Sequence, residues 1–160
     1  MSRSTCIIVA AALATPATAR TQSLRPVVSA DFVVSGVGGQ ADSATVRRLL
    51  GRPDSIQASD HPYDAHAKLI DWWYSALRVS FNPPNSVSGV WILGRGPTTA
   101  RGVSIGDSTA RVRQLYGRPG SVVREENAWL YEDPSSDLRF IKIWFTRGRV
   151  QRIFLGTALD

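Results

Sequence analysis

Two short stretches of the chain carry apolar residues at the spacing of an amphipathic helix. In each stretch the apolar side chains stand at positions i, i+3 and i+4, which share one helix face. They are Val46, Leu49 and Leu50 in the first stretch and Val112, Leu115 and Tyr116 in the second. A capping side chain precedes each stretch (Asp42, Ser108), and a glycine with a proline two places later ends it (Gly51, Gly117). The pattern predicts one helix between Asp42 and Gly51 and another over 109–116.

The two helical stretches follow one design. They align without a gap at a shift of 66 positions, from Gly51 to Gly117. A Trp-x-Tyr pattern comes after each of them, beginning at Trp72 and at Trp129. We therefore expect two copies of one small unit in tandem.

Alternation of apolar and polar residues predicts the strands. The candidates are 31–37, 69–74, 76–81 and 87–93 in the first unit, and 121–124, 128–132, 138–146 and 149–155 in the second. Turn residues stand at the joints, including two prolines within 82–85. Each unit is expected to be a helix followed by an antiparallel meander.

The same alternation assigns side chains to the two faces of the sheet, because successive residues of a strand point to opposite sides. The set expected to face the helices is apolar: Leu77, Val79, Phe81, Ile141, Ile143 and Phe145. The set expected on the other face mixes aromatics and cations: Arg78, Trp91, Phe140, Lys142, Trp144, Arg152 and Phe154. The face turned away from the helices should thus be rich in large aromatics and arginine.

The ends and joints of the chain suggest its boundaries. Arg3, an apolar run that ends at Leu13, and Ala17-Thr18-Ala19 predict a secretory signal peptide over 1–19. We expect a flexible lead-in over 20–30, the first unit over 31–93, a connector over 94–100 and the second unit over 101–160. After the leader, no stretch approaches the ~20 apolar residues of a membrane helix. The predicted protein is exported, to the periplasm or outside the cell.

Composition says more about partners than about the fold. The only cysteine, Cys6, lies in the leader, so packing without disulfides must hold the exported protein together. The chain has 19 Lys and Arg against 13 Asp and Glu, a net charge of +6. Outside the cytoplasm this excess favours an acidic protein surface or anionic lipid headgroups over nucleic acid. A basic surface that serves only solvation is an equally good interpretation.

The second unit carries the fuller set of family motifs. They are Ile105, Gly106, Ser108, Val112, Leu115, Gly117, Pro119, Trp129, Tyr131, the stretch 143–148, Val150 and Ile153. Repeated in order from about Phe32 to Leu155, these motifs resemble the superfamily that joins the β-lactamase inhibitor protein to outer-membrane assembly lipoproteins of the BamE (SmpA/OmlA) type. The resemblance implies an α+β fold, in which two tandem helix plus antiparallel-meander repeats form a shared sheet with helices on one face.

The resemblance also implies that the open, concave sheet face grips a protein partner. Two family features are missing from this sequence, since it has neither the disulfides of the inhibitor nor the anchoring cysteine of the lipoproteins. Asp71-Trp72-Trp73 is similar in composition to the hairpin that the inhibitor inserts into its enzyme. The same residues also fit a plain Trp-x-Tyr strand.

One polar stretch contains the residues best suited to metal binding or catalysis. His61 and His66 lie there with Asp60 and Asp64, and imidazole with carboxylate suits zinc or manganese. A metal-dependent hydrolase at this loop is therefore one alternative function. The spacing matches no known ligand motif, and a polar surface loop is the simpler interpretation. We predict no catalytic residues, no metal and no cofactor.

Two further patterns are interpreted as turns. The carboxylate pairs Glu125-Glu126 and Glu132-Asp133 flank the strand expected at 128–132, where hairpin turns would leave them solvated. The glycines at 36, 38 and 39 lead toward a helix N-terminus but lack the spacing of a nucleotide-binding loop. Neither pattern predicts chemistry.

The main hypothesis is an exported, non-catalytic protein-binding module that uses the outward sheet face. The predicted contact residues are Trp91, Trp129, Phe140, Lys142, Trp144 and Arg152. Aromatics would fill pockets of the partner, and the cations would orient an acidic partner. Burial in the core is the alternative for each aromatic, and a homodimer through this face would explain the pattern equally well. The other alternative function is an envelope assembly scaffold with peripheral contacts to anionic lipid.

Overall fold

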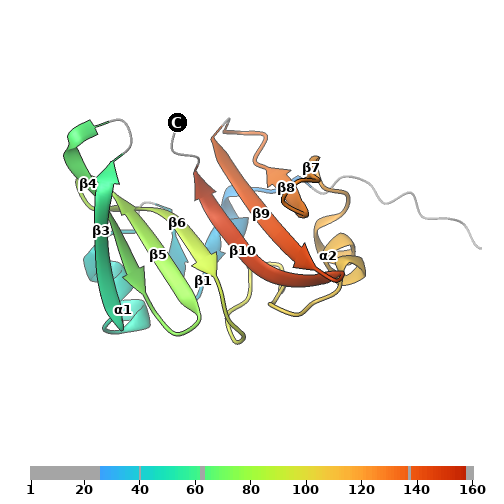
Figure 1. The fold of residues 1–160 in the computed structure, drawn as a ribbon, viewed down its shortest axis with the longest axis horizontal. Helices are drawn as coiled ribbons and strands as arrows, with labels where there is room; N and C mark the ends of the chain where they lie inside the picture. The colour runs from blue at the N-terminus through green and yellow to red at the C-terminus, as the bar shows by residue number, and fades with distance from the viewer. Residues whose placement is uncertain (1–25, 40, 62–63, 137, 158–160) are drawn as a thin grey trace, which may run out of the picture.

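The fold is built on one large antiparallel sheet. In the computed structural model, which describes residues 26–39, 41–61, 64–136 and 138–157, the strand order of this sheet is β3-β4-β5-β6-β10-β9-β8-β7 (Figure 1). Its strands are β3 (Ser55–His61), β4 (Asp64–Trp73), β5 (Leu77–Asn82), β6 (Ser86–Ile92), β7 (Ser121–Val123), β8 (Ala128–Glu132), β9 (Arg139–Thr146) and β10 (Arg149–Thr157). β3 to β6 form one meander and β7 to β10 the other, and the two meet where β6 pairs with β10.

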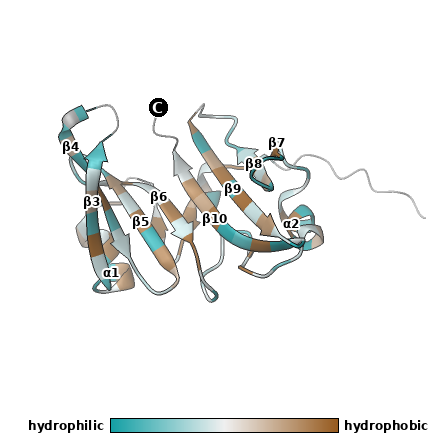
Figure 2. Cartoon of the chain, viewed as in Figure 1, coloured by the Kyte–Doolittle hydropathy of each residue, from teal (hydrophilic) through white to brown (hydrophobic). Residues whose placement is uncertain are grey.

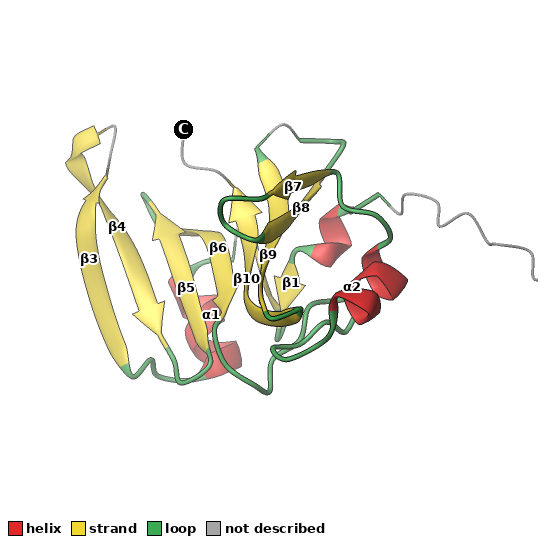
Figure 3. Cartoon of the chain, turned by 45° about the vertical axis from the view of Figure 1, so that its right-hand side comes forward, coloured by secondary structure: helices red, strands yellow, loops and turns green. Residues whose placement is uncertain are grey.

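Shorter elements cover one face of this sheet. They are η1 (Ser29–Asp31), β1 (Val33–Val34), β2 (Val37–Gly38), α1 (Ser43–Leu50) and α2 (Thr109–Tyr116), and the helices are red in Figure 3. Val46 of α1 and Val112 of α2 are fully buried in the same core as Val79 of β5 and Ile143 of β9. We call this covered side the inner face of the sheet and the opposite side the outer face.

Both helices begin and end as the sequence predicts. The side chains of Asp42 and Ser108 each accept a hydrogen bond from the backbone N–H three residues on, at 2.7 and 3.2 Å. Gly51 and Gly117 follow the last helical residues with φ of 81° and 80°, in the left-handed region that glycine adopts at little cost. The caps therefore fix the positions of the helices along the chain.

Strand alternation separates the faces as expected. Along β5, Leu77, Val79 and Phe81 are buried while the residues between them are partly exposed, and Figure 2 shows hydrophobic and hydrophilic residues alternating along the central strands. Ile141, Ile143 and Phe145 of β9 are buried in the same core. The inner face thus holds the apolar set predicted for it.

The segment before α1 is part of the core. Val27, Phe32, Val34 and Val37 are all less than a tenth exposed and belong to the main hydrophobic cluster. Within the flexible lead-in expected over 20–30, Val27 is buried, whereas residues 26 and 28–30 are exposed, and the lead-in stays a prediction. Residues 20–25 lie outside the described part of the chain.

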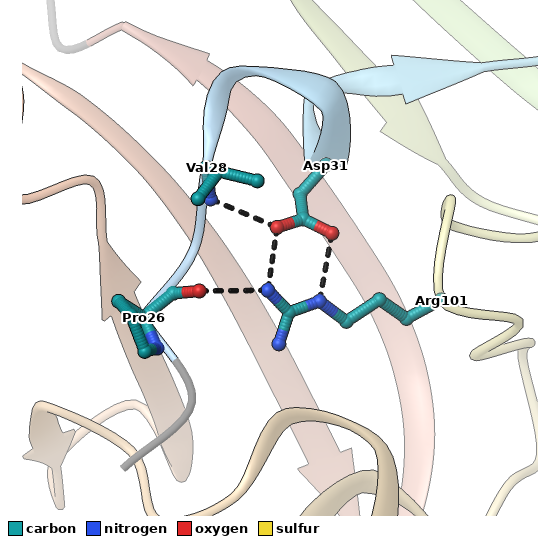
Figure 4. A network of polar contacts seen from close by, with 4 residues as sticks. All are labelled: Pro26, Val28, Asp31 and Arg101. Atoms are coloured by element: carbon teal, nitrogen blue, oxygen red, sulfur yellow. Dashed lines mark hydrogen bonds and ion pairs between the residues drawn. The ribbon is translucent and has the colours of Figure 1, made fainter.

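A polar network holds this segment in place (Figure 4). Arg101 donates from Nε and Nη2 to the two carboxylate oxygens of Asp31, at 2.7 and 2.6 Å, and from Nη2 to the carbonyl of Pro26 at 2.8 Å. The N–H of Val28 donates to the same carboxylate at 2.8 Å. The Asp31 side chain is only 7 % exposed, and the guanidinium lies over the ring of Tyr116, 4.9 Å from its centroid. One arginine thus joins the N-terminal segment to α2.

The predicted α+β class is wrong. α1 and α2 have only eight residues each, whereas the described residues form an eight-stranded and a two-stranded sheet, so the protein is mostly β. Eight helical residues span roughly 12 Å, which is too short to form a continuous helical layer. Residues 26–38 supply much of the inner cover instead. The expected class of two tandem helix plus antiparallel-meander repeats is not retained.

Removing Arg101 should destabilise the fold. In Arg101→Ala the buried Asp31 carboxylate loses its guanidinium partner, and we expect a loss of about 3 kcal/mol in the free energy of unfolding. Urea denaturation followed by circular dichroism measures this change. Arg95→Ala, at an exposed site, should change stability by no more than about 0.5 kcal/mol. Equal losses in the two variants would contradict a structural role for the network.

The buried phenol of Tyr116 should make the fold sensitive to alkali. Burial raises the pKa of Tyr116 to about 12, whereas an unfolded tyrosine titrates near ~10. The fold favours the neutral phenol, and this preference adds its full stability at pH values below the pKa of tyrosine in the unfolded chain. The contribution is lost as the pH rises through the pKa of Tyr116 in the folded protein. Ultraviolet titration should show a late tyrosinate step that Tyr116→Phe removes. Loss of the proton near pH ~10 with the fold intact would contradict this.

Candidate functional site

Aromatic and cationic side chains alternate across the outer face. From β4 to β9 they are Trp73, Arg78, Trp91, Arg152, Trp144 and Lys142, and we call this row the outer ladder. The strand register places them side by side, since Arg78 pairs with Trp73 and Trp91, and Arg152 pairs with Trp144. Five adjacent strands therefore contribute to one continuous row.

Stacking contacts join the members of the outer ladder. The guanidinium carbon of Arg78 is 5.1 Å from the ring centroid of Trp73 and 4.5 Å from that of Trp91. Arg152 lies 4.3 Å from the ring centroid of Trp144 and 5.9 Å from that of Trp91. The rings of Trp91 and Trp144 stack at 5.5 Å with an interplanar angle of 23°. The broad faces of both indoles are thus largely taken up by neighbours within the protein.

Two carboxylates balance part of this charge. Asp71 accepts a hydrogen bond from Ser80 at 2.6 Å and forms an ion pair with Arg78 at 3.7 Å. Glu126 accepts hydrogen bonds from Lys142 Nζ at 2.7 Å and from the indole Nε1 of Trp144 at 2.8 Å. These two hydrogen bonds, the one from Lys142 above all, hold the pKa of Glu126 below its usual range. Glu126 is therefore ionised at neutral pH, and both carboxylates are ordered by cations.

A shallow apolar hollow, the outer hollow, lies beside the ladder. It has a volume of about 380 Å³ and is lined by residues that include Leu69, Trp91, Phe140, Trp144 and Phe154. The ring of Phe154 contacts those of Trp91 and Phe140, with centroids 4.8 and 5.4 Å apart. Lys142 and Arg78 also line the hollow. The site offers an apolar floor with a cationic rim.

Two glycines make room for Phe154. Gly89 of β6 pairs with Gly156 of β10 beneath the ring. A Cβ on Gly156 would lie 2.7 Å from the Cα of Gly89 and 2.8 Å from the Phe154 ring. No real Cβ atom fits so close to backbone, so the glycine pair is required for the ring to lie flat against the sheet.

Five of the six predicted contact residues lie on the outer face. Trp91, Phe140, Lys142, Trp144 and Arg152 all come together at the outer ladder or at the outer hollow beside it. Their exposure varies widely: Arg152 is exposed, whereas Trp144 is only 6 % exposed because its neighbours cover both sides of the ring. The patch is thus packed and ordered, with edges rather than ring faces turned to solvent.

Trp129 is not part of the outer face. Its register partner is Ile143, an inner-face residue, and its ring packs on Phe145 at 4.7 Å with Arg113 of α2 4.8 Å from the ring centroid. Trp129 is therefore partly buried against the core on the inner face, apart from the other five residues, and its role as a contact residue stays a prediction. The partner of Trp129 across the β8–β9 ladder decides its face, and a sequence alone does not give that register.

Sequence reasoning did not select four residues of the site. The side chains of Trp73 and Asp71 both point from β4 to the outer face. Arg78 was predicted on that face but was not chosen as a contact residue. Alternation from Trp72, which faces the core, could have found Trp73 and Asp71. Glu126 reaches the ladder from the turn at 124–127, and no sequence signal predicts where a turn side chain ends up.

The two histidines of the polar stretch lie in paired strands, His61 at the end of β3 and His66 within β4. Asp60 forms an ion pair with Lys68 across the hairpin, and the N–H of His66 donates to Asp64 at 2.9 Å. In the described ranges of the chain, no three His, Cys, Asp or Glu side chains gather in a way that could hold a metal ion. The metal-dependent hydrolase predicted as an alternative at His61 and His66 gains no support from this geometry.

Comparisons with known proteins place the fold but not the function. No family model matches the chain, and no curated protein matches it. Among solved structures it is similar to an extracellular protein containing a SCP domain from Bacillus anthracis str. Ames. The two share 9 % sequence identity with a TM-score of 0.56, over 74 % of this chain and 43 % of that one, so the chain spans less than half of its neighbour.

This likeness concerns the fold alone. It gives no support to tandem repeats of the β-lactamase inhibitor type, and the resemblance to that superfamily stays a prediction. No helix in the described segments is long and apolar enough to cross a membrane.

The glycine pair under Phe154 should resist substitution. In Gly156→Ala the new methyl group meets backbone atoms that cannot move aside, and we expect a loss of about 1–3 kcal/mol in stability. Tryptophan fluorescence should also change, since Phe154 must leave Trp91. Gly39→Ala, where nothing lies within 4 Å of the added Cβ, is the matched control and should be close to neutral. A stable Gly156→Ala protein with unchanged fluorescence would refute this packing.

Proposed function

We propose that the chain is an exported, non-catalytic module that binds a protein partner through the outer face. The observation that carries this proposal is the outer ladder, which sets three tryptophans and three cations across five adjacent strands on the side away from the helices. Tryptophan and arginine are enriched at the energetic centres of protein interfaces. Export is proposed from the predicted leader at 1–19, and the extracellular nature of the structural neighbour is consistent with it.

The arrangement of the rings favours a protein over a sugar or a single-stranded nucleic acid. Both of those ligands stack on the open faces of aromatic side chains. Here Arg78 and Arg152 lie against Trp91 from different neighbouring strands, and Trp91 stacks on Trp144. An arginine stacked on a ring keeps its N–H groups at the edge, where they can bind carboxylates. The face therefore suits acidic side chains rather than flat rings.

The dimensions of the ladder suit the centre of a protein interface. Neighbouring strands lie ~4.8 Å apart, so the row from β4 to β9 is roughly 19 Å wide. A typical interface buries ~800 Å² on each partner, with hot spots near its middle. The ladder and the hollow together would form such a middle, with the polar parts of β3 and β8 as the rim.

The carboxylates of the face are poorly placed for acid–base catalysis. A general acid or base works best with a pKa near the working pH. The pKa of Glu126 is instead lowered by Lys142 and Trp144, and Asp71 is held by Arg78 and Ser80. This ordering of charges supports a binding role.

Site-specific photocrosslinking, followed by binding measurements, tests the proposal. A photoreactive residue at Phe140 should capture a partner from the envelope fraction or culture medium, whereas one at the exposed Leu49 of α1 should not. With the partner purified, Arg152→Ala should weaken its binding by about tenfold. Arg118→Ala removes the same charge at another exposed site and should leave the affinity unchanged.

Four results would contradict the proposal. Equal losses in the Arg152 and Arg118 variants would mean that only net charge matters. Capture of the same protein from Leu49 would place the contact elsewhere. Salt-sensitive binding to anionic vesicles in place of a protein would favour the lipid-associated scaffold, and crosslinking only to a second copy would favour a homodimer.

A further inference from the structure

One side chain of the protein already rests on the outer ladder. Glu126 extends from the turn at 124–127. Asn127 links this turn to β9, since its carbonyl accepts from the N–H of Phe145 at 2.9 Å and its side-chain amide donates to the carbonyl of Phe145 at 2.8 Å. One carboxylate oxygen of Glu126 accepts from Lys142 Nζ and the other from the indole Nε1 of Trp144. The charge of Arg152 acts on the same carboxylate. The outer face thus binds a carboxylate group in the free protein.

The donors of this contact are fixed, whereas the carboxylate is accessible. The side chains of Lys142 and Trp144 are 18 % and 6 % exposed, and stacking on Trp91 and Arg152 sets the direction of the indole N–H. The Glu126 side chain is 44 % exposed. Groups held in a fixed geometry lose little freedom when a ligand arrives, and an exposed side chain returns to water at little cost. This asymmetry makes Glu126 the replaceable member.

We infer that Lys142, Trp144 and Arg152 form a carboxylate-binding site, that Glu126 occupies it in the free protein, and that an acidic side chain of the protein partner displaces Glu126. The inference rests on the proposed function and identifies the chemistry of the partner segment. An apolar residue beside that acidic side chain would enter the outer hollow between Phe140 and Phe154.

The exchange conserves hydrogen bonds. Without any occupant, the indole N–H and the ammonium of the mostly covered Lys142 side chain would lack this partner, which is costly. A carboxylate of the partner replaces the carboxylate of Glu126 one for one, while Glu126 regains its hydration. Because Glu126 is tethered next to the site, it competes at a high effective concentration and weakens the binding of the partner. Removing it should therefore strengthen binding.

The test compares Glu126→Ala with Glu125→Ala. Both variants lose one negative charge from the same turn, but only the first empties the site. The probe is a blocked, fluorescent peptide of alternating glutamate and leucine, with a glutamine and leucine peptide as the neutral control. We expect Glu126→Ala to bind the acidic peptide roughly fivefold more tightly than Glu125→Ala or the unchanged protein. The neutral peptide should bind all three weakly and alike.

The indole N–H resonance of Trp144 gives a second, local readout. The resonance is assigned by its disappearance in Trp144→Phe. It should shift in Glu126→Ala and stay in place in Glu125→Ala. When the acidic peptide is added to Glu126→Ala, the resonance should move back toward its original position. A merely structural role of Glu126 would not restore the resonance.

The outcomes separate the inference from the proposed function. If the two glutamate variants bind the acidic peptide alike, displacement is refuted, while a selective effect of Arg152→Ala on the purified partner would leave the proposed function standing. If none of the proteins binds the acidic peptide, or if vesicles of phosphatidylglycerol bind in its place, the assignment of an acidic protein segment is overturned. If every outer-face variant still binds the partner as tightly as the unchanged protein, both the inference and the proposed function are overturned.

Discussion

The pairing of β6 with β10 is the contact on which the rest of the structure depends. Within the described part of the chain, four register pairs join the two meanders, from Ile92 with Ile153 to Gly89 with Gly156. On the inner face these pairs place Ile92 and Ile153 at the centre of the core, each with 0 % exposure. On the outer face the same pairs bring Trp91 and Phe154 together. Core and outer ladder are therefore two sides of one junction.

This shared origin explains why the outer face is ordered although no other element of the described residues covers it. Sheet faces exposed to water usually carry separate polar side chains, and large aromatics there tend to associate with other molecules. In this protein the aromatic rings are packed against each other and against guanidinium groups, so the face has few free ring surfaces. What it presents is a set of fixed N–H donors and an apolar hollow. Such a surface selects partners by the position of their charges as well as by their apolar area.

Local signals of the sequence predicted the parts of the fold that local interactions determine. The capping oxygens of Asp42 and Ser108 and the glycines after each helix fixed the helix ends, because these groups act on their own neighbours. Period-two alternation placed Val79 and Ile143 inward and Trp91 and Trp144 outward for a similar reason. The class was wrong because the length of a helix does not reveal what else fills the layer. Residues 26–38 fill much of it, and the strand expected over 31–37 gives no sign of this because it forms a separate two-stranded sheet of β1 and β2. Trp129 and Glu126 depend on strand register and turn geometry, which are set by contacts distant in sequence.

Hydroxyl-radical footprinting of the protein with and without its purified partner shows whether the outer face is the binding surface. We expect protection only on the outer face. Trp91, Phe140 and Phe154 should lose reactivity toward the radical, while Leu49 on α1 should keep it. Protection on the helical side, or along the edge strand β3 with the outer ladder unchanged, would contradict this expectation.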